Sequence, residues 1–82
     1  MVTVGILRGW RIVIYSNDHR PAHVHVNGSG KSAVFFLSCP VGPVNLRSCK
    51  GFSSRELQDI ERHLNQHVAE YCAKWGEIHD NH

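Results

Sequence analysis

The sequence lacks a hydrophobic run long enough to cross a bilayer. Its longest stretch without a charged residue covers residues 32–46, and Pro40, Gly42 and Pro43 interrupt it. A transmembrane helix needs about 20 consecutive apolar residues. The N-terminal segment also lacks the basic region and long apolar core of a secretory signal. We therefore expect a cytoplasmic protein that makes no contact with a membrane.

The sequence has few cysteines, and their number and spacing do not suggest disulfide pairs. Cys39, Cys49 and Cys72 are odd in number, and no two of them form a C-x-x-C motif. This argues against both a disulfide framework and a thiolate zinc knuckle. The prediction is three reduced thiols in a reducing compartment.

A strong charge of either sign is also absent. Nine Lys and Arg against seven Asp and Glu give a formal charge of +2 with neutral histidines. This mild basicity is weak evidence for a nucleic-acid partner, and the seven histidines predict a strongly pH-dependent surface charge. Six cations are scattered along the chain, where they could form a phosphate-binding surface or simply be solvated: Arg8, Arg11, Arg20, Lys31, Arg47 and Lys50.

Four segments carry the apolar and β-branched residues typical of strands. They are residues 2–7, 10–15, 23–26 and 31–37, and residues 44–46 add a short fifth candidate at an edge. The fourth segment is apolar on both faces, with Val34 and Phe36 opposite Phe35. Because one helix can cover only one face of a sheet, the second face predicts a homodimer.

A helix is predicted from Ser53 to about Gly76. Ser53 and Glu56 form a capping box, and Gly76 is a candidate C-terminal stop. An apolar stripe with spacings of three and four runs along it: Leu57, Ile60, Leu64, Val68, Tyr71 and Trp75. Residues 1–82 thus predict one small α+β domain, an antiparallel sheet of four or five strands packed against one C-terminal helix.

What the sequence has in excess is histidine, with three in seven residues. His23 and His25 alternate with Val24 and Val26, so a strand that buries the valines turns both histidine rings to its other face. His19 lies in the preceding turn. The alternative is that these histidines are exposed on the surface and form no functional site.

Metal ligation is one chemistry that such a cluster predicts. Two histidines on a strand can place their nitrogens about 2.1 Å from one zinc ion. His19, His67 or Asp18 would complete the coordination. Asp18 has a second interpretation, because aspartate also hydrogen-bonds its own backbone in turns.

Metal-free acid–base catalysis is the other chemistry. One neutral histidine would accept a proton and a protonated one would donate it, while Arg20 would stabilise an anionic transition state. RNA cleavage through the 2′-hydroxyl would suit these groups.

A second histidine pair lies on the predicted helix. His63 and His67 are four residues apart, and the phase of the stripe predicts a half-buried His67 and an exposed His63. No Glu lies between them to act as a base, so the pair differs from an H-E-x-x-H site.

The chain resembles a bacterial family catalogued as domain of unknown function 4160. The resemblance spans residues 6–75 and is carried by YSNDHRPAHVHV at residues 15–26, by KGFS at 50–53, and by Glu56, Leu57, Ile60, His67 and Trp75. It implies a small protein, often encoded beside another small protein and sometimes assigned to toxin–antitoxin pairs. Residues 38–43 depart from the family pattern.

By resemblance, the recurrent positions of the family include His19, Pro21, His23, His25 and His67. The leading hypothesis is thus a toxin–antitoxin-type protein acting on RNA through His19, His23, His25 and His67, with Arg20. The alternative is a non-enzymatic zinc-binding or protein-interaction module in which the same four histidines are the ligands. A co-encoded small protein would be its partner.

Overall fold

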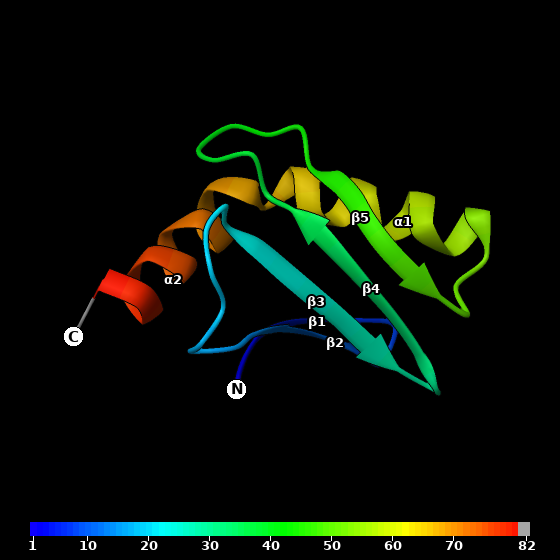
Figure 1. The fold of residues 1–82 in the computed structure, drawn as a ribbon. Helices are drawn as coiled ribbons and strands as arrows, with labels where there is room; N and C mark the ends of the chain where they lie inside the picture. Colours follow the sequence, from blue (N-terminus) through cyan, green and yellow to red (C-terminus); the bar gives the residue numbers. More distant parts are fainter. Residues whose placement is uncertain (81–82) are drawn as a thin grey trace.

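Five antiparallel strands form one sheet in the computed structural model, which describes residues 1–80. The strands lie in the sheet in chain order, as Figure 1 shows. Their bounds are β1 Val2–Leu7, β2 Trp10–Ile14, β3 His23–Gly28, β4 Lys31–Phe36 and β5 Asn45–Lys50. The four predicted strands are confirmed, and the fifth is longer than expected.

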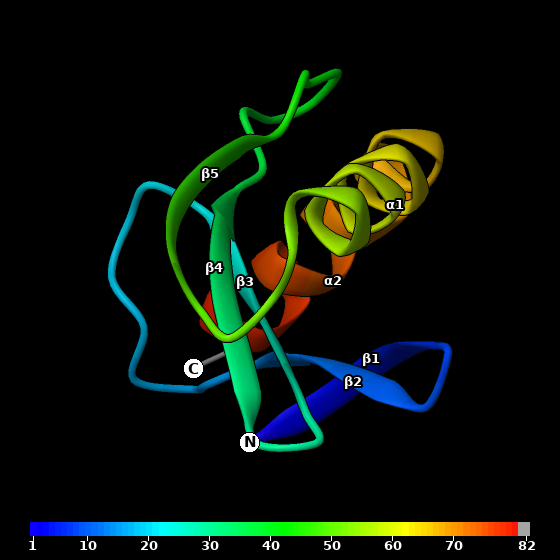
Figure 2. The same cartoon turned by 90° about the vertical axis from the view of Figure 1, so that its right-hand side faces the viewer.

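Two helices follow the sheet, α1 Ser54–Gln66 and α2 Val68–Asp80. Both lie on one side of β3, β4 and β5, and the β1–β2 hairpin curves beneath them (Figure 2). The apolar residues of the sheet pack against the predicted helical stripe, whose buried members are Ile60, Leu64, Val68, Tyr71 and Trp75. The structure is therefore α+β, with one core between sheet and helices.

The start of α1 agrees with the predicted capping box. The Glu56 amide donates to Ser53 Oγ at 3.1 Å, and the Ser53 amide donates to Glu56 Oε1 at 2.8 Å. Each side chain thus satisfies one backbone donor that the first turn leaves unpaired.

The prediction of one helix ending at Gly76 is wrong. The chain leaves helical geometry at His67, with φ −122° and ψ 17°, and α2 then continues through Gly76 to Asp80. A glycine ends a helix when it adopts positive φ, and Gly76 is not among the glycines that do so. No glycine or proline marks the break at His67, and the apolar spacing continues through it. The sequence therefore gave no sign of the break.

The prediction of three unpaired cysteines is also wrong. Cys39 and Cys72 form a disulfide with a Cα–Cα distance of 5.8 Å, and Cys49 is an exposed free thiol. Thirty-three positions separate the two partners, and only the packing of α2 beside the loop after β4 brings them together. The expected reducing compartment depended on unpaired thiols and loses that support.

Within residues 1–80, no helix combines the length and apolar character needed to cross a membrane.

Val34 and Phe36, on which the predicted homodimer depended, are only half-buried in the single chain. The Phe36 ring lies 6.4 Å from the His23 ring and 5.9 Å from the Arg47 guanidinium. Phe36 therefore has neighbours within its own chain, and the homodimer stays a prediction.

Candidate functional site

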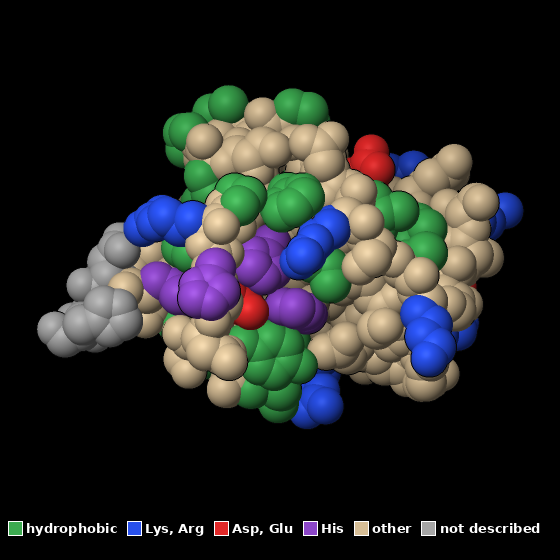
Figure 3. All heavy atoms as spheres, in the orientation of Figure 1, with side chains coloured by type: hydrophobic (Ala, Val, Ile, Leu, Met, Phe, Trp, Pro, Cys, Tyr) green, Lys and Arg blue, Asp and Glu red, His purple; other side chains and the backbone are tan. Residues whose placement is uncertain are grey.

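A cavity of about 370 Å³ lies on the face of the sheet to which His23 and His25 point, opposite the buried Val24 and Val26. The loop before β3 and the strands β3, β4 and β5 supply its lining: Asn17, Asp18, His19, Arg20, Pro21, His23, His25, Phe36 and Arg47. Figure 3 shows the histidines gathered around one acidic side chain, with basic side chains beside them. Three histidines, one aspartate and two arginines therefore line one cavity.

Strand β3 places the two central histidines. Val24 and Val26 are fully buried in the core, and the alternation of the strand turns His23 and His25 to the opposite face. The two rings are 5.2 Å apart between centroids. The predicted side-by-side arrangement of these rings is confirmed.

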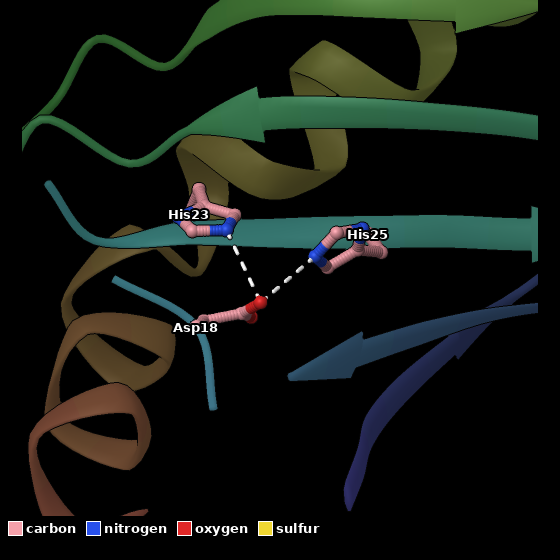
Figure 4. A group of neighbouring side chains, drawn as sticks. All are labelled: Asp18, His23 and His25. Carbon is pink, nitrogen blue, oxygen red and sulfur yellow. Dashed lines mark hydrogen bonds and ion pairs between the residues drawn. The ribbon is translucent and has the colours of Figure 1, made fainter. Parts of the chain in front are cut away.

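Asp18 is fixed by a turn that precedes the strand. Its amide donates to the Tyr15 carbonyl at 3.0 Å, and its Oδ2 accepts from the Tyr15 amide at 3.1 Å. The second oxygen, Oδ1, lies 3.4 Å from Nε2 of His23 and 3.4 Å from Nε2 of His25 (Figure 4). The turn therefore aims one carboxylate oxygen at both rings.

The second ring nitrogen of His23, Nδ1, also has a hydrogen-bond partner. Its Nδ1 lies 2.9 Å from the Pro21 carbonyl oxygen, which can only accept, so Nδ1 carries the proton. In the neutral ring, Nε2 then presents a lone pair to the Asp18 carboxylate. Both side chains are largely buried, with exposed fractions of 8% and 11%. A cation placed between these two acceptors would satisfy both of them.

The distances suit a metal ion. One ligand atom from each of Asp18, His23 and His25 lies within 4.8 Å of the other two, and no other such group of three occurs among residues 1–80. A tetrahedral ion bound at about 2.1 Å separates its ligands by about 3.4 Å. The Nε2–Oδ1 separations have that value, and two histidines with one carboxylate are a common ligand set for zinc and iron.

His19 and Arg20 lie at the rim and not in this ligand group. Both are exposed, and both line the first cavity and a neighbouring one of about 470 Å³. The Arg20 guanidinium lies 5.1 Å from the centre of the buried Trp75 ring on α2. These two residues are positioned to contact a ligand in the cavity.

Helix α2 also supports the loop that carries Asp18. His79 stacks on Trp75 at 3.7 Å and places its Nε2 3.1 Å from the Tyr15 carbonyl. Tyr15 in turn hydrogen-bonds Asp18, so the C-terminal end of α2 helps to hold the Asp18 loop in place.

His67 does not join the cluster. Its ring lies 4.6 Å from His63, and its side chain is 44% exposed. His63 is the half-buried member of the pair and lies 2.9 Å from the Tyr71 hydroxyl. The predicted burial of the two is therefore reversed: His67 leaves helical geometry, and the His63 ring packs toward Tyr71.

Two lining residues received little weight from the sequence. Arg47 was one of six scattered cations, and Phe36 was a residue of the predicted dimer face. Both reach the cavity because β4 lies beside β3 and β5 lies beside β4, and neither belongs to the histidine motif. The sequence did not reveal the order of the strands, which brings these two residues to the cavity.

The sequence model of one protein family, described as "Domain of unknown function (DUF4160)", matches residues 9–76. No curated protein matches the chain. No solved structure matches it either.

Proposed function

Since this chain belongs to the DUF4160 family, whose description states no reaction, we propose its function from the site itself: it binds a divalent transition metal through Asp18, His23 and His25. Zinc is the first candidate. The ligand group lies within residues 9–76, the segment that the family model matches.

One observation carries the proposal. Asp18 Oδ1 lies 3.4 Å from two imidazole nitrogens, and the proton on His23 is committed to the Pro21 carbonyl. A hydrogen bond from the second ring nitrogen of a histidine to a carbonyl is the usual support of a metal ligand. The Tyr15 amide plays the same part for Asp18.

Three protein ligands would leave one position of a tetrahedral ion for water or substrate, and all three residues line the cavity. Structural zinc sites use four protein ligands, whereas catalytic sites use three and keep a place for water or substrate. A metal at this position would polarise an oxygen ligand and lower the pKa of bound water. The proposal is therefore a site of the catalytic type.

Metal-free acid–base cleavage of RNA is the weaker candidate. His23 Nδ1 is committed to the Pro21 carbonyl, and Nε2 faces the Asp18 carboxylate at 3.4 Å, so neither ring nitrogen of His23 is turned toward a substrate. A toxin–antitoxin role, a co-encoded partner and a cytoplasmic location stay predictions that rest on family resemblance and sequence.

Metal analysis of tag-free protein tests the proposal. We expect about one zinc per chain after purification without chelator, and a zinc affinity that falls at least about 100-fold in Asp18→Asn and in His25→Gln. Elemental mass spectrometry gives the content, and competition with a chromophoric chelator gives the affinity.

His67→Gln is the matched control, because it removes a histidine of the family motif that lies outside the ligand group. It should bind zinc like the native protein, and circular dichroism should show all three variants folded. Equal zinc affinity in the native protein and in Asp18→Asn would contradict the proposal, and so would a native protein that takes up neither zinc, iron nor manganese.

A further inference from the structure

We propose that His79 is a proton-dependent latch: its protonated ring fastens the C-terminal end of α2 to the loop that carries Asp18, and loss of a proton releases that loop. The latch lies outside the ligand group. It uses only groups of this chain, so it does not depend on metal binding.

Both ring nitrogens of His79 point at carbonyl oxygens. Nδ1 lies 2.8 Å from the Trp75 carbonyl, one helical turn back, and Nε2 lies 3.1 Å from the Tyr15 carbonyl. A carbonyl oxygen can only accept a hydrogen bond, and a neutral imidazole has one N–H to donate. The two hydrogen bonds therefore form together only when the ring carries two protons and a positive charge.

The position of the ring suits a positive charge. His79 lies in the last turn of α2, where the helix dipole favours a cation. Its ring also stacks on Trp75, with 3.7 Å between the centroids and 16° between the planes, and an aromatic face attracts a cation. Two features besides the hydrogen bonds thus favour the protonated ring.

The loop brings three charged or titratable groups to the cavity of about 470 Å³ that His79 also lines: Asp18, His19 and Arg20. The Arg20 guanidinium lies 5.1 Å from the Trp75 ring and opposes a second positive charge there, whereas the Asp18 carboxylate favours one. Beyond Trp75, the His23 ring of β3 is 6.5 Å from the Trp75 ring. The charges of the loop offset each other, so the two carbonyl acceptors decide the state of His79.

The charged residues of α2 itself do not face the latch. Lys74 and Glu77 lie five and two residues before His79. At about 100° per residue, neither shares a helix face with His79.

The Tyr15 carbonyl connects the latch to Asp18. Figures 1 and 2 both show the loop between β2 and β3 beside the end of α2. The Tyr15 carbonyl also accepts the Asp18 amide at 3.0 Å, and the Tyr15 amide donates to Asp18 Oδ2 at 3.1 Å. A change at His79 therefore reaches Asp18 through one carbonyl group.

Loss of one proton turns one of the two hydrogen bonds into a repulsive contact. The neutral ring would present a nitrogen lone pair to a carbonyl oxygen, and two acceptors cannot satisfy each other. The bond to Trp75 is shorter and joins groups that the helix already holds together, so the bond to Tyr15 is the one lost. The loop and α2 then separate, and the cavity that both of them line widens.

Nuclear magnetic resonance of chelator-treated, ¹⁵N-labelled protein tests the latch between about pH 5 and 8, where histidines titrate. Two-bond ¹H–¹⁵N spectra report the protonation of each ring nitrogen. We expect Nε2 of His79 to lose its proton as the pH rises, while Nδ1 keeps one. The exchange protection of the Asp18 amide, corrected for intrinsic exchange, should fall about tenfold over the same titration, the contribution of a charge-assisted hydrogen bond.

His79→Gln should abolish the pH dependence of this protection, because glutamine does not titrate. His67→Gln is the matched control, since it removes an exposed histidine near the junction of the two helices, and it should keep the pH dependence. His19→Gln removes another titrating side chain of the cavity and should keep it as well.

Three results would overturn the latch. The first is a native His79 ring with only one protonated nitrogen at the acid end of the titration, and the second is loss of the proton from Nδ1 in place of Nε2. Both are read from the native protein and need no variant. The third is a pH dependence of Asp18 protection that persists in His79→Gln or disappears in His19→Gln.

Discussion

Asp18 shows how one residue can serve a turn and a site together. Its Oδ2 accepts the Tyr15 amide, as a turn aspartate does, and its Oδ1 faces two imidazoles. The two interpretations available from sequence are thus compatible, because a carboxylate has two oxygens. The backbone hydrogen bond also fixes the direction of the oxygen that faces the rings.

At the residue scale, sequence predicted neighbours well where the strand period alone decides them. His23 and His25 share a face because Val24 and Val26 are buried in the core. His67 could not be placed in the same way, since its position depends on where two helices meet. Sequence therefore predicted two of the three proposed ligands and named Asp18 only as one of several completing groups.

The burial of His63 predicts that the free energy of unfolding falls in acid. Burial lowers the pKa of His63 below its usual 6.5, the nearby His67 lowers it further, and Glu70 opposes the change. Between the folded and unfolded pKa values the unfolded chain binds more protons. The contribution of His63 is therefore fully present above pH 6.5 and is lost as the pH falls through the folded pKa.

Thermal melts at pH 7.5 and pH 5.0 test this in chelator-treated protein, so that metal release adds nothing. The fall in melting temperature should be smaller in His63→Gln than in the native protein. His67→Gln should give an intermediate fall, because it removes only one of the two causes. An unchanged fall in His63→Gln would refute the assignment.

At the element scale, periodicity predicted which residues face the core but not where elements break. The stripe from Ile60 to Trp75 is buried through both helices, so the predicted core holds. The apolar stripe continues through the break at His67, whereas the burial of His63 and His67 is the reverse of the prediction. Apolar spacing constrains the buried face more tightly than the exposed one.

Strand β1 meets α2 at a position where only glycine fits. The pairing of β1 with β2 shifts register between Thr3 and Gly5, and a Cβ on Gly5 would collide with the Tyr71 hydroxyl. We expect Gly5→Ala to lower the free energy of unfolding by about 1–3 kcal/mol, the usual effect of overpacking. Urea unfolding measures it.

Tyr71→Phe makes this prediction specific, because it removes the atom that the new methyl group would strike. In the Tyr71→Phe background, Gly5→Ala should cost about 1 kcal/mol less than in the native protein. Additive effects of the two substitutions would show that the cost of alanine at Gly5 has another origin. Thr3→Ala, at an exposed position of the same strand, is the control.

At the scale of the whole molecule, the Cys39–Cys72 disulfide joins the loop after β4 to α2. Among three cysteines, sequence offers no rule for which two pair, and the choice follows from the packed fold. The Val44 amide supports the same contact, donating to Asn65 Oδ1 on α1 at 2.8 Å. The loop that departs from the family pattern is thus attached to both helices.

Removing the disulfide should lower stability substantially. It closes a segment of 33 residues, for which the loss of chain entropy predicts about 3–4 kcal/mol. The double variant Cys39→Ser, Cys72→Ser should unfold at correspondingly lower urea concentration, whereas Cys49→Ser should match the native protein. Alkylation of oxidised native protein should label one thiol, and labelling of three would contradict the pairing.

The order of the strands has a consequence for how the molecule folds. Each strand pairs with its neighbour in sequence, so the sheet needs only short loop closures, and a chain rich in such local contacts folds quickly. The three proposed ligands fall within eight consecutive residues, from Asp18 to His25. We therefore expect the ligand group to assemble early on the folding pathway, with the first pairing of β3, before the helices close over the opposite face.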